Sequence, residues 1–227
     1  AEAVRELPDG DAWTYEAKSD GYRCLGAKRS NRVVLWSRRG NLFTLRFPEI
    51  AHACERLPPD TLIDGEVIAI DENGLTSFNA LQHKGAGAQL QFYAFDLMVH
   101  RGSIVTHLPI ETGRDLLTNA LAKVEYPVLQ STTFEAKPVD FIRAARELQF
   151  EGIIAKRNGS IYECGRRSGA WQKYKLNQSQ EFVIGGYTPG NPFDALIVGV
   201  YDGGALNFVA KVRAGFVPHS RREVFKS

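Results

Sequence analysis

The segment 16–23, EAKSDGYR, contains a lysine whose position suits chemistry at phosphorus. Lys18 stands just before the turn-forming pair Asp20-Gly21. A lysine at the end of a strand beside such a turn can present its amine to a cleft, and a neutral amine is a good nucleophile toward phosphorus. Burial or neighbouring cations would lower the pKa of the amine and expose its lone pair. Taken alone, the spacing fits a solvated lysine better.

An isolated acid lies inside an apolar segment at 62–70, LIDGEVIAI. Glu66 enters a run of residues that favour a buried strand. A carboxylate there is costly unless it binds a cation, a ribose hydroxyl or a basic side chain. The segment is equally compatible with Glu66 on the wet face of a half-exposed strand.

Aromatic residues crowd the segment 92–98, FYAFDLM. Side chains alternate between the two faces of a strand, so we expect Tyr93, Phe95 and Leu97 to face one way. Strand aromatics usually lie in the core. One at the edge of a cleft could instead stack on a nucleobase.

A cluster of basic residues follows Glu151-Gly152. Alternation along 171–176 places Trp171, Lys173 and Lys175 on one strand face. Two lysines on one face repel each other unless an anion or carboxylates lie between them. The pattern indicates a polyphosphate site, although a solvated basic edge strand would look the same. The other members of the cluster are Lys156, Arg157, Arg166 and Arg167, opposed only by Glu163.

The elements that position these residues follow an α+β pattern of antiparallel sheets with covering helices. The first eleven residues are polar, and we expect them to be frayed. One helix is expected to start at Pro48 and another at Ser77, whose hydroxyl would cap it. Two further helices are expected at 110–122 and 138–148. In the last helix, Phe141, Ala145 and Leu148 form the inward stripe. The expected strands are 13–17, 23–28, 32–37, 61–70, 91–99, 151–157 and 171–176.

The pattern of expected elements changes after residue 177. Segments 182–187, 195–201 and 206–212 read as strands separated by turns rich in Gly and Pro, with no helix. We therefore expect a boundary near 178, with residues 1–177 as one domain and 178–227 as a small all-β unit. Three strands are few for an independently stable sheet.

Composition sets outer limits on the function. The 227 residues carry a net charge of +2 and are 44% hydrophobic, as in a soluble globular protein. No apolar run approaches the length of a membrane span. Cys24, Cys54 and Cys164 are odd in number and widely spaced, which argues against a disulfide framework or a zinc site and favours a reducing cytosol.

The clusters together, in this order, resemble the motifs of the covalent nucleotidyltransferase superfamily of DNA ligases, RNA ligases and mRNA capping enzymes. The matching segments are 18–23 (KSDGYR), 37–40 (SRRG), 64–66 (DGE), 95–96 (FD), 151–152 (EG) and 173–175 (KYK). The sequence at 93–97, YAFDL, resembles that of DNA ligases more than that of capping enzymes. Segment 180–190, QEFVIGGYTPG, resembles the ligase module of bacterial and archaeal end-joining ligases.

The resemblance implies an ATP-dependent DNA ligase with a nucleotidyltransferase fold, ATP-grasp-like in its antiparallel sheets and helices, followed by a partial OB-fold. Lys18 would attack the α-phosphorus of ATP and carry AMP, which passes to the 5′-phosphate of a nick before the 3′-hydroxyl displaces it. The remaining roles are implied residue by residue. Glu16 would lie near the adenine edge, mainly through its backbone, and Phe95, with Tyr93 as the reserve, would stack on adenine. Arg23 and Glu66 would hold the ribose, and Glu151, with Glu66, would bind Mg²⁺ or Mn²⁺. Lys173 and Lys175 would contact the α-phosphate, and Arg38 would bind the 5′-phosphate.

The resemblance also sets expectations about partners and alternatives. It implies nicked double-stranded DNA as substrate, end-joining proteins as possible partners, a monomer, and a prokaryotic cytoplasmic location at the nucleoid. The family's last basic motif has no counterpart before Ser227, which suggests a truncated chain that self-adenylates slowly. The alternatives are an RNA ligase or capping-type enzyme, a less favoured NAD-dependent ligase, and a noncatalytic nucleic-acid-binding module.

Overall fold

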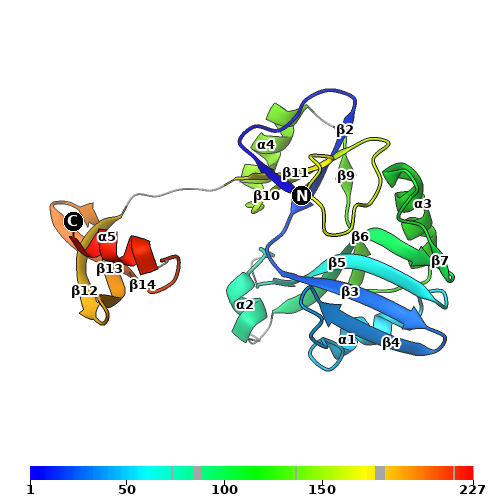
Figure 1. Cartoon of the computed structure of the whole chain (residues 1–227), viewed down its shortest axis with the longest axis horizontal. Coiled ribbons are helices and arrows are strands. Elements are labelled where there is room, and N and C mark those ends of the chain that lie inside the picture. Colours follow the sequence, from blue (N-terminus) through cyan, green and yellow to red (C-terminus); the bar gives the residue numbers. More distant parts are fainter. Residues whose placement is uncertain (73, 84–87, 136, 177–181, 217, 227) are drawn as a thin grey trace. The chain divides into compact units, whose positions relative to one another are not determined.

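The computed structural model describes the whole chain except residues 73, 84–87, 136, 177–181, 217 and 227 (Figure 1). The chain forms two units, Ala1–Asn177 and Gln178–Ser227. The sequence-expected boundary near residue 178 lies in a stretch outside the described residues. Sheets and helices alternate, so the mixed α+β class expected from the sequence is confirmed.

A six-stranded sheet forms the larger half of the first unit. Its order is β4 (Arg32–Ser37), β3 (Tyr22–Arg29), β5 (Thr61–Ile70), β6 (Gln89–His100) and β7 (Ser103–Ile104), and β8 (Val128–Gln130) pairs with β6. The long central strands are rich in β-branched and aromatic residues, which fit a pleated surface. Helices α1 (Pro48–Cys54), α2 (Phe78–His83) and α3 (Ile110–Leu121) accompany this sheet. As expected, Ser77 caps α2, accepting a hydrogen bond from the Ala80 N–H at 3.2 Å.

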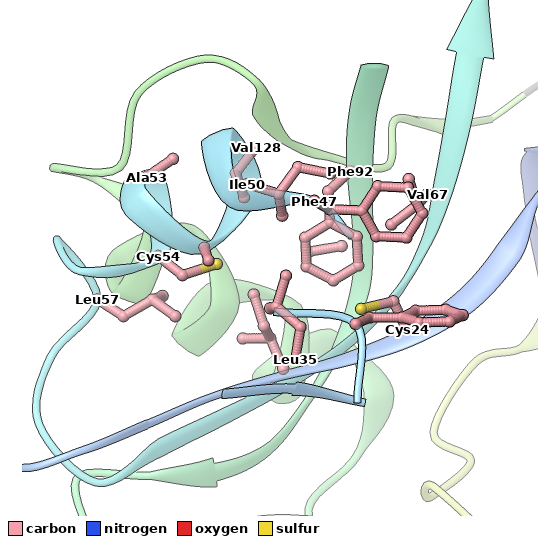
Figure 2. Packing of buried hydrophobic residues seen from close by; sticks show 14 of the residues in the cluster. Cys24, Leu35, Phe47, Ile50, Ala53, Cys54, Leu57, Val67, Phe92 and Val128 are labelled. Carbon is pink, nitrogen blue, oxygen red and sulfur yellow. The ribbon is translucent and has the colours of Figure 1, made fainter. Parts of the chain in front are cut away.

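The main hydrophobic core lies against this sheet. Figure 2 shows Ile50 and Cys54 of α1 approaching Leu35 of β4, with Phe47 and Phe92 beside them. All five side chains are buried. Pro48 stands in the first turn of α1, where its missing N–H removes no helical hydrogen bond. This core fixes the sheet whose strands β3, β5 and β6 also carry residues of the pocket described below.

A five-stranded sheet completes the first unit, in the order β1 (Glu2–Val4), β11 (Trp171–Lys175), β10 (Gly152–Arg157), β2 (Trp13–Lys18) and β9 (Thr133–Phe134). Helix α4 (Pro138–Glu147) packs Phe141 and Ala145 against Tyr15 of β2. The expected stripe on this helix is wrong in its last member. Leu148 follows the end of the helix and is 59% exposed, because it has left the helical periodicity.

The N-terminal residues differ from the expectation of a frayed end. β1 pairs in parallel with β11, with Glu2 opposite Gln172 and Val4 opposite Tyr174. Backbone hydrogen bonds require no apolar side chains, so a short polar segment can extend a sheet. β11 thus lies between two strands, and the basic edge-strand interpretation of Lys173 and Lys175 does not apply.

The second unit is a curled, OB-fold-like sheet of β12 (Val183–Pro189), β13 (Phe193–Asp202) and β14 (Ala205–Val212). Register shifts interrupt both strand pairs. The expectation of a unit without a helix is wrong, since α5 (Pro218–Lys226) follows the sheet. Its Val224 packs with Phe216 against Phe193, although the helix is otherwise too polar to stand out in the sequence. None of the helices described is long and apolar enough to cross a membrane.

Candidate active site

Lys18 ends β2, directly opposite Gly152 of β10. Its Nζ donates a hydrogen bond to Oε2 of Glu151, forming an ion pair in which both side chains are largely shielded from solvent. The adjacent glycines permit this approach. A Cβ on Gly152 would lie 2.3 Å from the Tyr174 carbonyl oxygen, and one on Gly21 would lie 2.2 Å from that of Val67. The motif glycines therefore let β10 lie close to β11 and let the chain after Lys18 lie close to β5.

Further charges surround this ion pair. Lys175 Nζ lies 3.8 Å from Oε1 of Glu151, so the carboxylate stands between two lysines. The pKa of Asp20 is raised by burial and by repulsion from the same Glu151 carboxylate. Of the two lysines expected on one face of β11, Lys175 therefore has an acid beside it.

An apolar pocket of about 380 Å³ opens beside Lys18. We use the name apolar pocket for this cavity, whose walls include Ile68, Ile70, Tyr93, Phe95, Phe134 and Trp171. Five of the residues expected from the sequence to form the site line it together. They are Glu16, Lys18, Arg23, Glu66 and Phe95.

Strict alternation along β6 does not hold around Phe95. Gly65 of β5 pairs with Ala94 and Asp64 pairs with Asp96, so Phe95 is an extra residue in the ladder. Tyr93 and Phe95 both line the apolar pocket, as expected. Leu97 is instead buried in the main core, because a bulge changes which face the following residues occupy.

Glu16 is buried in the wall of the apolar pocket, where it meets two cations. Its Oε1 lies 2.6 Å from Nη1 of Arg114 and 2.8 Å from Nζ of Lys156. Its Oε2 accepts a hydrogen bond from the Ser131 hydroxyl at 3.2 Å. Lys156, itself 1% exposed, also donates to the Phe95 carbonyl oxygen at 3.2 Å. A buried carboxylate with these partners satisfies the rule that buried charges are paired.

Arg23 is held by a second buried acid. Its Nε donates to Oδ1 of Asp64 at 3.0 Å, and the Tyr162 hydroxyl donates to Oδ2 at 2.7 Å. Asp64 is fully buried and Arg23 is partly exposed. Burial and the Asp64 charge raise the pKa of the Tyr162 hydroxyl. The guanidinium is thus fixed at the pocket wall.

Glu66 is half-buried and stands near Lys18 and Arg23. Its Oε1 accepts a hydrogen bond from the Gly21 N–H at 3.2 Å. Burial raises the pKa of Glu66 to about 7, against the opposing effect of Lys18 and the Gly21 hydrogen bond. The carboxyl therefore has more affinity for protons than an exposed glutamate, and an added cation or hydroxyl donor would favour its ionised form.

A second cavity, of about 630 Å³, has walls of a different kind. We call it the arginine cavity, and its basic lining residues are Arg23, Arg38, Arg39, Arg46, Arg166, Arg167 and Lys173. The two cavities share four lining residues, Ala1, Arg23, Glu66 and Trp171. Arg38 and Lys173, expected from the sequence to meet phosphates, both line this second cavity.

Two residues of the site were missed by sequence reasoning. Arg114 and Tyr162 carry no expected role, yet both bind acids of the site. Arg114 had a detectable signal, since it lies on the same stripe of α3 as the buried residues Ile110 and Leu117. A charged residue in an inward stripe indicates a buried partner. Tyr162 lies in a loop, where periodicity gives no such signal.

The acids fit a hard divalent cation held partly by a substrate. Among the described residues, no group of three His, Cys, Asp or Glu side chains gathers as a self-contained metal site. Mg²⁺ commonly takes one or two carboxylates and completes its shell with phosphate oxygens and water. Glu151, which pairs with Lys18, and Glu66, whose pKa Lys18 lowers, offer a donor set of this kind.

Residues 1–175 match the family model described as ATP dependent DNA ligase domain. A multifunctional non-homologous end joining protein LigD from Pseudomonas aeruginosa is 35% identical over 99% of this chain. A prophage-derived DNA ligase-like protein, LigB, from Bacillus subtilis is 28% identical, with 99% of this chain and 81% of that protein covered. The chain spans 28% of the length of the Pseudomonas LigD and of the first mycobacterial LigD relatives.

Solved structures give the same grouping. The ligase domain of Mycobacterium tuberculosis LigD superposes with a TM-score of 0.70 at 28% identity, covering 96% of this chain and 73% of that one. A mycobacterial DNA ligase D complexed with ATP and MES gives a TM-score of 0.69 at 27% identity, covering 100% and 76%. The sequence-derived family and fold are confirmed.

Proposed function

The chain belongs to the ATP-dependent DNA ligase domain family, and from this premise we propose that it seals nicks in duplex DNA through an AMP carried on Lys18. The observation that carries the proposal is the placement of the Lys18 amine. It is held by Glu151 at the wall of the apolar pocket, which Phe95 also lines. The relatives named LigD supply the context of end joining.

The two cavities suggest how ATP binds. The base enters the apolar pocket and stacks on Phe95, while Arg23 and Glu66, which line both cavities, hold the ribose. The polyphosphate then points toward Lys173 and the arginine cavity. Lys175 contacts the α-phosphate from beside Glu151. This orientation sets the α-phosphorus between Lys18 and the basic side chains, where charge neutralisation lowers the barrier.

In the first step, Lys18 Nζ attacks the α-phosphorus. A P–N bond forms, the bond from that phosphorus to the bridging oxygen breaks, and pyrophosphate leaves. The ammonium must give a proton to solvent water before the attack, because only the neutral amine has a lone pair. In the structure the ammonium is paired with Glu151, so nucleophilicity requires that this ion pair open. Glu151 and Glu66 would hold Mg²⁺ or Mn²⁺, which when bound supplies charge neutralisation at the phosphates.

The later steps use the same residues. The AMP passes from Lys18 to the 5′-phosphate of the nick, breaking the P–N bond and forming a P–O–P linkage. The 3′-hydroxyl then attacks the 5′-phosphate, and AMP leaves. Arg38 lines the arginine cavity and binds the 5′-phosphate. Residues 1–177 act as the adenylation domain, and residues 178–227 contribute an OB-fold-type surface for DNA on the nucleoid of a prokaryotic cell.

The proposal is tested with ATP labelled at the α-phosphate, Mg²⁺, and a duplex containing a phosphorylated nick. We expect label first on the protein, then on the DNA strand, and finally a sealed strand. Parallel reactions with GTP and with nicked RNA separate the capping-type and RNA-ligase alternatives, and both should be slower. DNA binding without any labelled protein or strand would instead support a noncatalytic binding module.

A further inference from the structure

Arg46 stands two residues before α1, and its guanidinium is stacked on three aromatic rings. Cζ of Arg46 lies 4.6 Å from the centre of the Tyr22 ring, 5.5 Å from that of Phe47 and 5.6 Å from that of Phe43. Phe43 and Phe47 are buried in the main core, and Tyr22 packs against it. Aromatic rings attract a cation without neutralising its charge. These three rings, which we call the aromatic cage, therefore hold the guanidinium in place and leave its charge available.

The charge of Arg46 is not balanced by an acid of the fold. Arg23 and Arg114 each pair with a buried carboxylate, those of Asp64 and Glu16. Among the residues that the structure describes, no acid forms an ion pair with Arg46. The Arg46 side chain is partly exposed and lines the arginine cavity. A guanidinium that is fixed by packing and lacks a counterion is suited to bind an anion from outside the chain.

The surroundings of Arg46 favour a phosphodiester of a nucleic-acid strand over the phosphates of a free nucleotide. Arg46 shares its segment with Arg38, the residue proposed for the 5′-phosphate, whereas the lysines proposed for the α-phosphate lie on β11. Leu42 and Leu45, in the same segment, are 70% and 94% exposed. Exposed apolar side chains near a basic cavity indicate a partner with both charged and apolar parts. A DNA strand, with its charged phosphates and apolar sugar faces, is such a partner.

We propose that Arg46, held by the aromatic cage, binds the first internal phosphodiester of the 5′-phosphorylated strand at the nick, while Arg38 binds the terminal phosphate. This rests on the proposed function, in which the arginine cavity receives that strand. Contacts to phosphates fix the register and orientation of a protein on DNA. One contact would leave the strand free to pivot about its terminal phosphate. A second contact on the next phosphate fixes the direction of the strand, and with it the position of the terminal phosphate relative to Lys18.

The first test uses the unaltered chain and a nicked duplex in which one phosphodiester at a time is replaced by an uncharged methylphosphonate. Binding is measured by fluorescence anisotropy at one fixed salt concentration, because salt alone changes the affinity. We expect the neutral linkage next to the terminal phosphate to weaken binding about fivefold. The same replacement far from the nick should have a much smaller effect. Equal affinities for the unmodified duplex and for the duplex with the neutral first linkage would overturn the proposal.

The second test removes the charge of Arg46. Arg46→Met keeps an unbranched side chain that packs well on aromatic rings, and thermal unfolding checks its fold. In this variant the neutral first linkage should cause no further loss of affinity, while removal of the terminal phosphate should weaken binding as it does in the unaltered chain. Arg56→Met, at an exposed arginine that follows α1, is the matched control and should keep the full sensitivity to the neutral linkage. Full sensitivity in Arg46→Met would contradict the proposal.

A third variant separates the charge of Arg46 from its placement. Arg46→Lys keeps a positive charge but loses the planar guanidinium that stacks on the rings, so it should retain only part of the sensitivity to the neutral linkage. Full sensitivity in Arg46→Lys would contradict the role of the aromatic cage.

Two further measurements identify the source of the phosphate and keep this inference apart from the proposed function. ATP affinity should be equal in the unaltered chain and in Arg46→Met. A lower affinity for ATP with unchanged binding of the nick would assign Arg46 to the nucleotide and overturn the proposal. Sealing of the nick is followed separately. The expected linkage sensitivity without sealing would refute the covalent function alone, whereas sealing with the same sensitivity in both proteins would refute this inference alone.

Discussion

The apolar pocket and the arginine cavity meet at Arg23, Glu66 and Trp171, yet they are built from different parts of the chain. The pocket takes its walls largely from strands, and its one buried acid, Glu16, is fully paired. The cavity takes most of its basic residues from loops and turns near β4 and β11, where side chains remain exposed. Walls of these kinds suit a flat, neutral group in the apolar pocket and a variable, charged group in the arginine cavity.

Replacing Phe95 with Ala should separate the two regions most strongly. Phe95 lies 6.5 Å, edge to face, from the Trp171 ring, and its loss removes the proposed stacking surface for the base. Stacking on an aromatic side chain contributes about 1–3 kcal/mol, so ATP affinity should fall about 10- to 100-fold. Affinity for inorganic tripolyphosphate, which needs only the arginine cavity, should stay constant. Both are measured by titration calorimetry.

Tyr93→Ala is the matched control, since Tyr93 lines the same pocket and is the reserve stacking residue. It should weaken ATP binding less than Phe95→Ala. A larger effect at Tyr93 would transfer the stacking role to that residue. Equal losses of ATP and tripolyphosphate binding would mean that the two regions are not separable.

Glu66, which lines both cavities, should make the free energy of unfolding depend on pH. Burial raises the pKa of Glu66 from 4.5 to about 7 in the folded chain. The folded state therefore binds the proton more tightly, and this stabilisation is present below the unfolded pKa and lost as pH rises through about 7. Glu66→Gln lacks the titration. Its stability relative to the unaltered chain should increase by about 1–2 kcal/mol from about pH 5 to about pH 8, allowing for partial solvent exposure.

Urea unfolding at both pH values measures this difference without nucleotide. The pKa of Asp96 is raised to about 6 by burial, but Asp96 is present in both proteins and cancels in the comparison. A difference that does not change with pH would mean that Glu66 titrates as an exposed carboxyl. The Glu66 carboxyl would then be more accessible to water than its half-buried position indicates.

Arg38→Ala should give the smallest effect, confined to the arginine cavity. Loss of one phosphate contact should weaken binding of a phosphorylated nick about fivefold and lower the salt-dependence slope by about one. ATP affinity should not change. Arg32→Ala, at the other end of β4 and also exposed, is the control and should bind the nick normally. Equal effects of the two substitutions would leave only general electrostatic attraction.

The sequence predicted the elements well wherever composition and periodicity agree. The expected bounds of β4 and β5 match the structure, because apolar patterning and turn residues delimit them. The alternation of 92–98 failed at Phe95, since a bulge depends on the partner strand and leaves no local signal. β1 was missed because its pairing with β11 is made by backbone groups, which leave no pattern of side chains in the sequence.

The site was predicted as residue types but not as partnerships. Lys18, Glu66 and Phe95 stand in motifs, and they do lie together. Their supporting contacts join segments up to 133 residues apart, as in the pair of Lys18 with Glu151. Tyr162 on Asp64 is of the same kind. Such contacts are set by tertiary packing, which periodicity does not report.

The most direct test of Lys18 as the nucleophile is the intact mass of the chain after incubation with ATP and Mg²⁺, beside Lys18→Ala and the exposed-lysine control Lys123→Ala. We expect a gain of one AMP in the unaltered chain and in the control, and none in Lys18→Ala. An adenylate that persists in Lys18→Ala would contradict the assignment of Lys18 as the nucleophile.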